Sequence, residues 1–222
     1  MSYAGRMKVH GDYYRDGYAH LEKLVPAAVA QDFLAQIKSS LENAEVPLEG
    51  FMREGVMLKR PALEIYAHQH KPLLTFLYGL TPTMCELTQR ELLPTYSYFR
   101  VYRAGDVCWV HSDRFACEHS LSLTLAYSDG KPWSFEIGKK RLTHAEPVET
   151  TFQEDEYSAI DMGVGDAILY QGVYYRHGRV QPNPNRWSAH IFLHWVDGNG
   201  HFKDCAFDGK ANTTPVDFQL SA

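Results

Sequence analysis

Apolar residues follow two different periods along this chain, and the change comes near residue 94. Between residues 26 and 43 they recur every four positions, which predicts an amphipathic helix that begins at Pro26. The stripe consists of Val29, Phe33, Ile37 and Leu41. Residues 61–93 are expected to form further pieces of helix, beginning near Pro61, Pro72 and Pro82, with Pro94 as the stop signal.

After residue 94 the period becomes two, and turns rich in Gly, Asp and Pro separate the apolar segments. Seven strands are predicted, at 97–103, 107–111, 118–127, 133–137, 157–162, 166–171 and 186–196. In 120–126 leucines occupy one face and Ser or Thr the other. In 186–196 one face is expected to be core, with Trp187, Ile191, Leu193 and Trp195.

Helices followed by strands predict an α+β, mainly β fold in which the N-terminal helices pack on the sheet. One apolar and one polar face per strand favours a strand barrel or jelly roll with a lined cavity. We expect a single domain over 1–222. Its parts are an N-terminal helical buttress (1–94), a catalytic core (95–198) and a C-terminal tail (199–222).

The composition narrows the classes of partner. The formal charge is −5, which disfavours nucleic acid and anionic membranes. No apolar run reaches 18 residues and the N-terminus has no signal-peptide core, so no membrane partner is expected. The four cysteines form no C-x-x-C pair, which favours free thiols in the cytoplasm. Nothing in the pattern specifies an oligomeric state.

Candidate chemistry comes from a histidine followed two residues later by a carboxylate. Such residues share one face of a strand and can bind one metal ion together. The chain has three of these pairs: His10-Gly-Asp12, His111-Ser-Asp113 and His144-Ala-Glu146. His10 and Asp12 lie in a polar terminal segment, and His144 and Glu146 lie in a loop. His111, in contrast, is the last residue of a predicted strand. His177 is the candidate third ligand, and two His with one carboxylate form the facial triad of non-heme iron oxygenases.

Two residues downstream suit an oxo acid bound at such a metal. Arg186 offers a guanidinium fork that pairs with a carboxylate, and Ser188 would share its face of the strand. His190 and His194 also fall on this face and are expected to line the cavity rather than bind metal.

In these pieces and their order the sequence resembles the Fe(II)/2-oxoglutarate-dependent dioxygenases, in particular the prolyl-4-hydroxylase-like and phytanoyl-CoA-hydroxylase-like branches. The resemblance covers about residues 96–196 and implies a double-stranded β-helix (jelly-roll) core. It implies that His111, Asp113 and His177 bind catalytic Fe(II). It further implies that Arg186 and Ser188 bind 2-oxoglutarate. Tyr102 is expected to bind it as well, because family members often have a tyrosine that binds the co-substrate at a similar position.

The resemblance implies hydroxylation of a C–H bond with O₂, releasing succinate and CO₂, and the carboxylate Asp113 favours oxygen transfer over halogenation. A small-molecule substrate is expected; the alternatives are a peptide or protein (prolyl-type) hydroxylase, a cupin-like metal protein not using 2-oxoglutarate, and a non-catalytic binding module.

Residues flanking the ligands are nominated for substrate contacts, among which Arg114 and Arg176 would suit an anionic group. The others are Trp109, Tyr170, Tyr174 and Tyr175.

Overall fold

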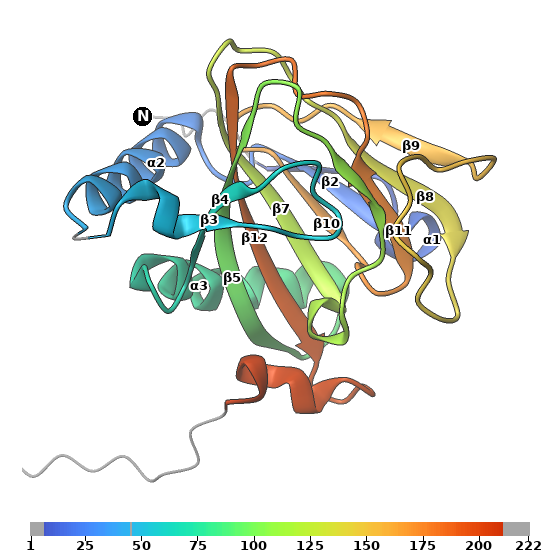
Figure 1. The fold of residues 1–222 in the computed structure, drawn as a ribbon. Helices are drawn as coiled ribbons and strands as arrows, with labels where there is room; N and C mark the ends of the chain where they lie inside the picture. The colour runs from blue at the N-terminus through green and yellow to red at the C-terminus, as the bar shows by residue number, and fades with distance from the viewer. Residues whose placement is uncertain (1–6, 45, 211–222) are drawn as a thin grey trace, which may run out of the picture.

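The computed structural model describes residues 7–44 and 46–210, and two antiparallel sheets dominate it (Figure 1). The large sheet has the order β1-β2-β10-β7-β12-β5-β4-β3 and the small sheet the order β6-β11-β8-β9. The large-sheet strands are β1 (Lys8–His10), β2 (Tyr18–Glu22), β3 (Met52–Arg53), β4 (Ala62–Tyr66), β5 (Leu92–Arg103), β7 (His119–Tyr127), β10 (Ala167–Tyr170) and β12 (Trp187–Asp197). The small-sheet strands are β6 (Cys108–His111), β8 (Phe135–Arg141), β9 (Tyr157–Ile160) and β11 (Tyr175–Arg179). This mainly β arrangement is consistent with a jelly-roll fold.

The helices cover one face of the large sheet. They are α1 (Tyr13–Asp16), α2 (Ala27–Glu42) and α3 (Lys71–Thr88), with 3₁₀ turns at Leu48–Phe51, Phe115–Cys117 and Lys203–Gly209. Ile37 of α2 and Leu77 of α3 are fully buried in one cluster with the leucines of β7 and with Ile191, Leu193 and Trp195 of β12. The amphipathic stripe of α2 and the apolar face of the sheet therefore form the main core, as their periods predict.

The other face of the large sheet is polar and is turned toward the small sheet. Ser120, Ser122 and Thr124 of β7 are fully buried, and so are His190 and His194 of β12. Aromatic contacts join the two sheets, such as Phe135 of β8 against Tyr170 of β10, with ring centroids 4.9 Å apart. The predicted alternation of faces is confirmed, except that Trp187 at the start of β12 is 37% exposed rather than core.

The prediction of several helices over 61–93 was wrong. Residues 62–66 form strand β4, and one helix, α3, continues through Pro82. Pro82 is exposed, so water can satisfy the carbonyl group that proline leaves without a donor. Strand β5 begins at Leu92 and includes Pro94. Since β4 pairs with β5 only from Tyr98 to Val101, the missing N–H of Pro94 removes no hydrogen bond to β4. The first 94 residues thus contribute strands as well as helices.

Strand β11 was missed because its sequence, Tyr-Arg-His-Gly-Arg, has no apolar alternation. All five residues are buried. Arg176 is neutralised by Glu146 at 3.3 Å and Glu149 at 2.9 Å. Its role is therefore in an ion-pair network, which the nomination of Arg176 for substrate contact did not foresee.

Two further findings concern the ends and the helices. Residues 211–222 of the expected C-terminal tail lie outside the described residues. Within 7–44 and 46–210, no helix has both the length and the apolar composition needed to span a bilayer.

Candidate metal centre and its cavity

Three side chains converge where β6 and β11 pair. His111 ends β6 and lies opposite His177 of β11, while Asp113 follows β6 by two residues. The Nε2 atoms lie 3.6 Å (His111) and 3.5 Å (His177) from the two carboxylate oxygens of Asp113. One donor atom from each residue lies within 4.8 Å of the others, which is a spacing that a single metal ion can bridge.

Backbone contacts orient both imidazoles. Nδ1 of His111 donates to the Trp109 carbonyl at 2.7 Å, and Nδ1 of His177 donates to the Tyr175 carbonyl at 2.9 Å. A proton on Nδ1 leaves the lone pair on Nε2, the atom that faces Asp113. The donor set therefore fits a divalent metal without any rearrangement of tautomers.

Asp113 is held by the loop that precedes β11. Its N–H donates to the Gly172 carbonyl at 2.8 Å. A Cβ at Gly172 would lie 2.7 Å from the Cys117 carbonyl oxygen and would also collide with the Asp113 carboxylate. Glycine is required here because the carboxylate occupies the space that any side chain would take.

The charges of the three residues suit metal binding. Burial lowers the pKa of His111, with a smaller contribution from His177, so its imidazole is neutral. Burial acts to raise the pKa of Asp113, but the two imidazoles outweigh it and hold that pKa well below its usual value. The site thus presents an ionised carboxylate beside the neutral imidazole of His111.

A narrow cavity opens beside the three ligands, and two arginines lie in its wall. Arg100 of β5 is paired with Glu64 at 2.6 Å and donates to the Tyr102 hydroxyl at 2.8 Å. Arg179 of β11 is 2% exposed. It donates to the Trp133 carbonyl and lies 3.3 Å from the Met162 sulfur. Among residues 7–44 and 46–210 no carboxylate lies within 4 Å of Arg179, so its direct contacts are with these two neutral acceptors.

Arg186, predicted to anchor an oxo acid, does not join this cavity. It precedes the first residue of β12, its side chain is 76% exposed, and it pairs with Asp129 at 3.1 Å. The spacing from His177 is as expected, but the strand begins one residue too late to turn Arg186 inward. Ser188 is buried and accepts a hydrogen bond from Asn183 at 3.1 Å, whereas Tyr102 does line the cavity.

Sequence reasoning missed Arg179 because it missed β11. His177 and Arg179 are two residues apart on one strand, so they share a face. His190 of β12 was expected to line the cavity; it is fully buried, and its Nε2 has no hydrogen-bond partner among the residues that the structure describes. Burial, and then the charges of Arg179 and Arg100, hold the pKa of His190 well below its usual value. The imidazole of His190 is thus neutral in the field of these two guanidinium groups.

Glu136 of β8 provides a test of electrostatics near Arg179. Burial raises its pKa from 4.5 to about 7, although its carboxylate accepts a hydrogen bond from Val180 N–H at 2.9 Å. A raised folded-state pKa gives stability that is present below pH 4.5 and lost as pH rises through about 7. In urea unfolding, Glu136→Gln should therefore become more stable relative to wild type between these pH values, by at most about 3 kcal/mol. Exposed Glu42→Gln is the control, and an unchanged difference for Glu136→Gln would contradict the shift.

A second group of possible ligands shares Asp113 and includes Cys117 and His194. Burial, followed by the Asp113 charge, raises the pKa of the Cys117 thiol well above its usual value, so it is not a thiolate. The Tyr96 hydroxyl lies 3.1 Å from Cys117 Sγ, and the Tyr96 ring stacks on His194. A neutral thiol favours metal binding at the first group rather than this one.

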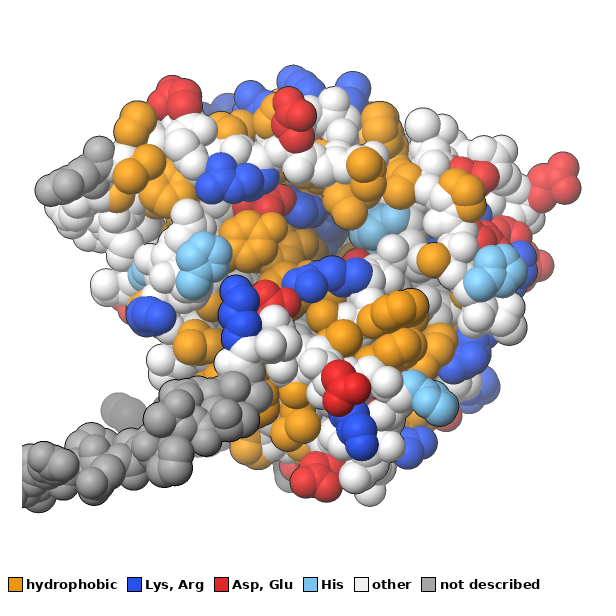
Figure 2. Space-filling view, turned by 60° about the horizontal axis from the view of Figure 1, so that its bottom comes forward, with side chains coloured by type: hydrophobic (Ala, Val, Ile, Leu, Met, Phe, Trp, Pro, Cys, Tyr) orange, Lys and Arg blue, Asp and Glu red, His pale blue; other side chains and the backbone are white. Residues whose placement is uncertain are grey.

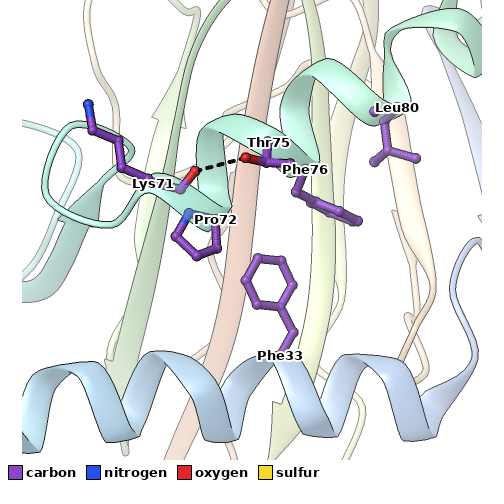
Figure 3. Close-up of a pocket in the computed structure, with 7 residues that line it drawn as sticks. Phe33, Lys71, Pro72, Thr75, Phe76 and Leu80 are labelled. Carbon is purple, nitrogen blue, oxygen red and sulfur yellow. Dashed lines mark hydrogen bonds between the residues drawn. The ribbon is translucent and has the colours of Figure 1, made fainter.

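Another hollow lies between α2 and α3 on the helical side of the large sheet (Figure 3). Phe33 points from α2 toward Pro72 and Phe76 of α3. Its walls are apolar, and Lys71 is the one ionisable residue among those that line it. The lining residues include no carboxylate, imidazole or thiol that could bind a metal ion.

Comparison with known proteins gives a fold. No protein-family model matches the chain, and no curated protein matches it in sequence. The structure is similar to SnoK, a non-heme alpha ketoglutarate dependent carbocyclase from nogalamycin biosynthesis, with TM-score 0.67 and 12% identity over 93% of this chain and 91% of SnoK. It is also similar to the epimerase SnoN in complex with Fe3+, alpha ketoglutarate and nogalamycin RO, with TM-score 0.61 and 13% identity over 95% and 93%. A Pseudomonas putida prolyl-4-hydroxylase gives 0.56 and 13% over 82% and 95%. The chain thus shares the fold of 2-oxoglutarate-dependent oxygenases.

Proposed function

We propose that this chain, which has the fold of the iron- and 2-oxoglutarate-dependent oxygenases, is itself such an enzyme, with His111, Asp113 and His177 as its Fe(II) ligands. The observation that carries the proposal is the convergence of two oriented Nε2 atoms and an ionised carboxylate beside a cavity that contains a buried guanidinium. The two facing sheets would form the double-stranded β-helix of that fold.

Bound iron would supply O₂ activation coupled to oxidation of 2-oxoglutarate to succinate and CO₂. The residues of this chain orient the ligands and keep water from the reacting centre. Phe135 stacks 5.7 Å from the His177 ring, and Tyr170 lies 4.6 Å from it on the other sheet. These rings limit motion of His177 and leave little room for solvent.

The far carboxylate of 2-oxoglutarate is proposed to pair with Arg179 rather than Arg186. Arg179 is buried without a carboxylate partner, whereas Arg100 already has Glu64 and Arg186 has Asp129. The unpartnered Nε2 of His190 and the Tyr102 hydroxyl offer additional hydrogen bonds. A guanidinium fork, an imidazole and a phenol together suit one carboxylate.

We propose hydroxylation of a C–H bond of a small molecule. The support is a hollow of about 770 Å³ lined by Arg114, the residue after Asp113, a volume typical of small-molecule sites. The carbocyclase and the epimerase among the similar structures suggest alternative reactions, and the prolyl-4-hydroxylase suggests an alternative substrate.

The cysteines support a reducing, cytoplasmic setting for a single-domain enzyme, because all four are free thiols: Cys85, Cys108, Cys117 and Cys205.

Anaerobic titration tests the proposal. Purified protein should bind one equivalent of Fe(II), and adding 2-oxoglutarate should produce the visible metal-to-ligand charge-transfer band of a chelated oxo acid. Binding of Fe(II) without the band would favour a cupin-like protein that does not use 2-oxoglutarate. No stoichiometric uptake of Fe(II) would leave a binding module and contradict the proposal.

A further inference from the structure

A hollow next to the metal centre is unusually basic for this chain. We name it the basic cleft, and it is lined by Arg53, Tyr66, Lys71, Tyr96, Arg114 and Lys210 among others. Figure 2 looks onto the face where Lys and Arg side chains surround a hollow with hydrophobic walls. The whole chain carries a formal charge of −5, yet this lining has four cationic side chains and one carboxylate, Asp208.

Most of this positive charge is unpaired within the described part of the chain. Arg114 pairs with Asp208 at 3.0 Å. Among residues 7–44 and 46–210, no carboxylate lies within 4 Å of Arg53, Lys71 or Lys210. Arg53 is held in place by the Gly50 and Met52 carbonyls, both at 2.8 Å. Cations that converge on a hollow without partners attract an anionic ligand.

The cleft reaches the metal centre through Arg114 and Tyr96. Arg114 follows Asp113 directly, and its guanidinium lies 4.2 Å from the centre of the Tyr96 ring. The Tyr96 ring also stacks on His194, with ring centroids 4.6 Å apart. A ring nitrogen of His194 lies within 4.8 Å of an Asp113 oxygen. Tyr96 and His194 thus connect the cleft to Asp113.

A row of aromatic rings runs from the cleft to the metal cavity. Tyr66 and Tyr96, which line the cleft, both stack on Tyr98, with centroids 5.3 Å and 6.1 Å away. Tyr98 lines the metal cavity and stacks on Phe192 at 4.9 Å. This aromatic lining suits an apolar ring skeleton.

From this geometry we infer that the basic cleft is the substrate site, and that the substrate is a small aromatic or polycyclic compound with an acidic group. The inference rests on the proposed function, since it assigns the cleft to the reaction at His111, Asp113 and His177. The acid group lies among Arg53, Lys71 and Arg114, and the rings lie along the tyrosine row with the oxidised carbon toward Asp113. This assignment gives Arg114 the role for which the sequence nominated it, contact with an anionic group.

Three matched probes test this inference: 2-naphthoate, its uncharged amide 2-naphthamide, and the non-aromatic anion cyclohexanecarboxylate. Calorimetry on the full chain loaded with Mn(II) and 2-oxoglutarate should show naphthoate binding at least about tenfold more tightly than either of the others. Mn(II) in the metal site should broaden the proton resonances of bound naphthoate. Broadening places the probe beside the triad, which a surface site elsewhere on the chain would not do.

Charge variants give the second readout. Arg53→Gln and Lys71→Gln should each weaken naphthoate binding about three- to fivefold, and the double variant more than tenfold, with naphthamide unaffected. Lys38→Gln, which removes an exposed charge from α2, is the matched control and should change nothing.

The possible results separate the assignment of the basic cleft from the proposed oxygenase function. Equal affinity for naphthoate and naphthamide, or no effect of the variants, overturns the anionic substrate site even if Mn(II) and 2-oxoglutarate bind. Naphthoate binding without Mn(II)-dependent broadening places the cleft outside the reaction and also overturns the inference. Failure to bind Mn(II) and 2-oxoglutarate overturns the proposed function, and with it the assignment of the cleft as a substrate site.

Discussion

Replacing His177 by alanine is expected to weaken Fe(II) binding at least about 100-fold and to abolish succinate formation. Because His177 is one of three proposed direct ligands, its loss should exceed the effects of roughly 10- to 100-fold that are typical of groups that only orient ligands. Fe(II) affinity is measured anaerobically by competition with a chromogenic chelator. Urea unfolding in parallel shows whether the truncated side chain also weakens the packing against Phe135 and Tyr170.

The control for this change is His144→Ala, since His144 also lies in a histidine–x–acid pair but its side chain is exposed in a loop, where it forms a hydrogen bond with Thr143. It should leave Fe(II) affinity and succinate formation at the wild-type level. If His144→Ala reduced Fe(II) affinity and His177→Ala did not, the metal centre would be elsewhere. If neither mattered, the chain would have no site of this kind.

Replacing Arg179 by glutamine is expected to weaken 2-oxoglutarate binding about 100-fold, because removing one partner of a buried charge pair typically costs 2–5 kcal/mol, roughly 30-fold or more. Fe(II) affinity should stay close to wild type, since Arg179 is not a ligand. Arg179→Lys should recover part of the affinity, because it restores the charge without the two-pronged geometry. Affinity is read from the charge-transfer band in anaerobic titrations.

Arg186→Gln is the matched control, with the same substitution at an arginine that is 76% exposed and paired with Asp129. Its effect on 2-oxoglutarate affinity should be less than about twofold, as for an exposed ion pair. The opposite pattern, a large loss with Arg186→Gln and none with Arg179→Gln, would contradict the proposed orientation of the oxo acid.

The two arginines show where inference from spacing stops. Arg186 lies nine residues after His177, the separation expected from the family resemblance, and it falls on the correct parity for the inner face of β12. Parity holds only inside a strand, and β12 begins at Trp187. The inward positions that the structure does provide, from Ser188 to His194, were assigned correctly because β12 pairs with β5 without a register shift from Trp187 to Leu193.

Local pattern by itself determined the elements whose apolar residues meet one continuous core. The helix α2 and the two-faced strands β7 and β12 could be predicted because burial of one face imposes a period of 3.6 or 2. His111, Asp113 and His177 could be nominated because few residue types bind iron and their order along the chain is restrictive.

Tertiary structure alone decided the rest. Strand β11 has no apolar alternation because both of its faces are buried among partners that are remote in sequence, such as Glu146 and Glu149 for Arg176. Pairing of β11 with β6 brings His177 to His111, and the same strand buries Arg179 beside them. The identity of the arginine in the cavity and the convergence of basic residues in the cleft depend on these long-range contacts, because charge and burial are properties of neighbours in space rather than in sequence.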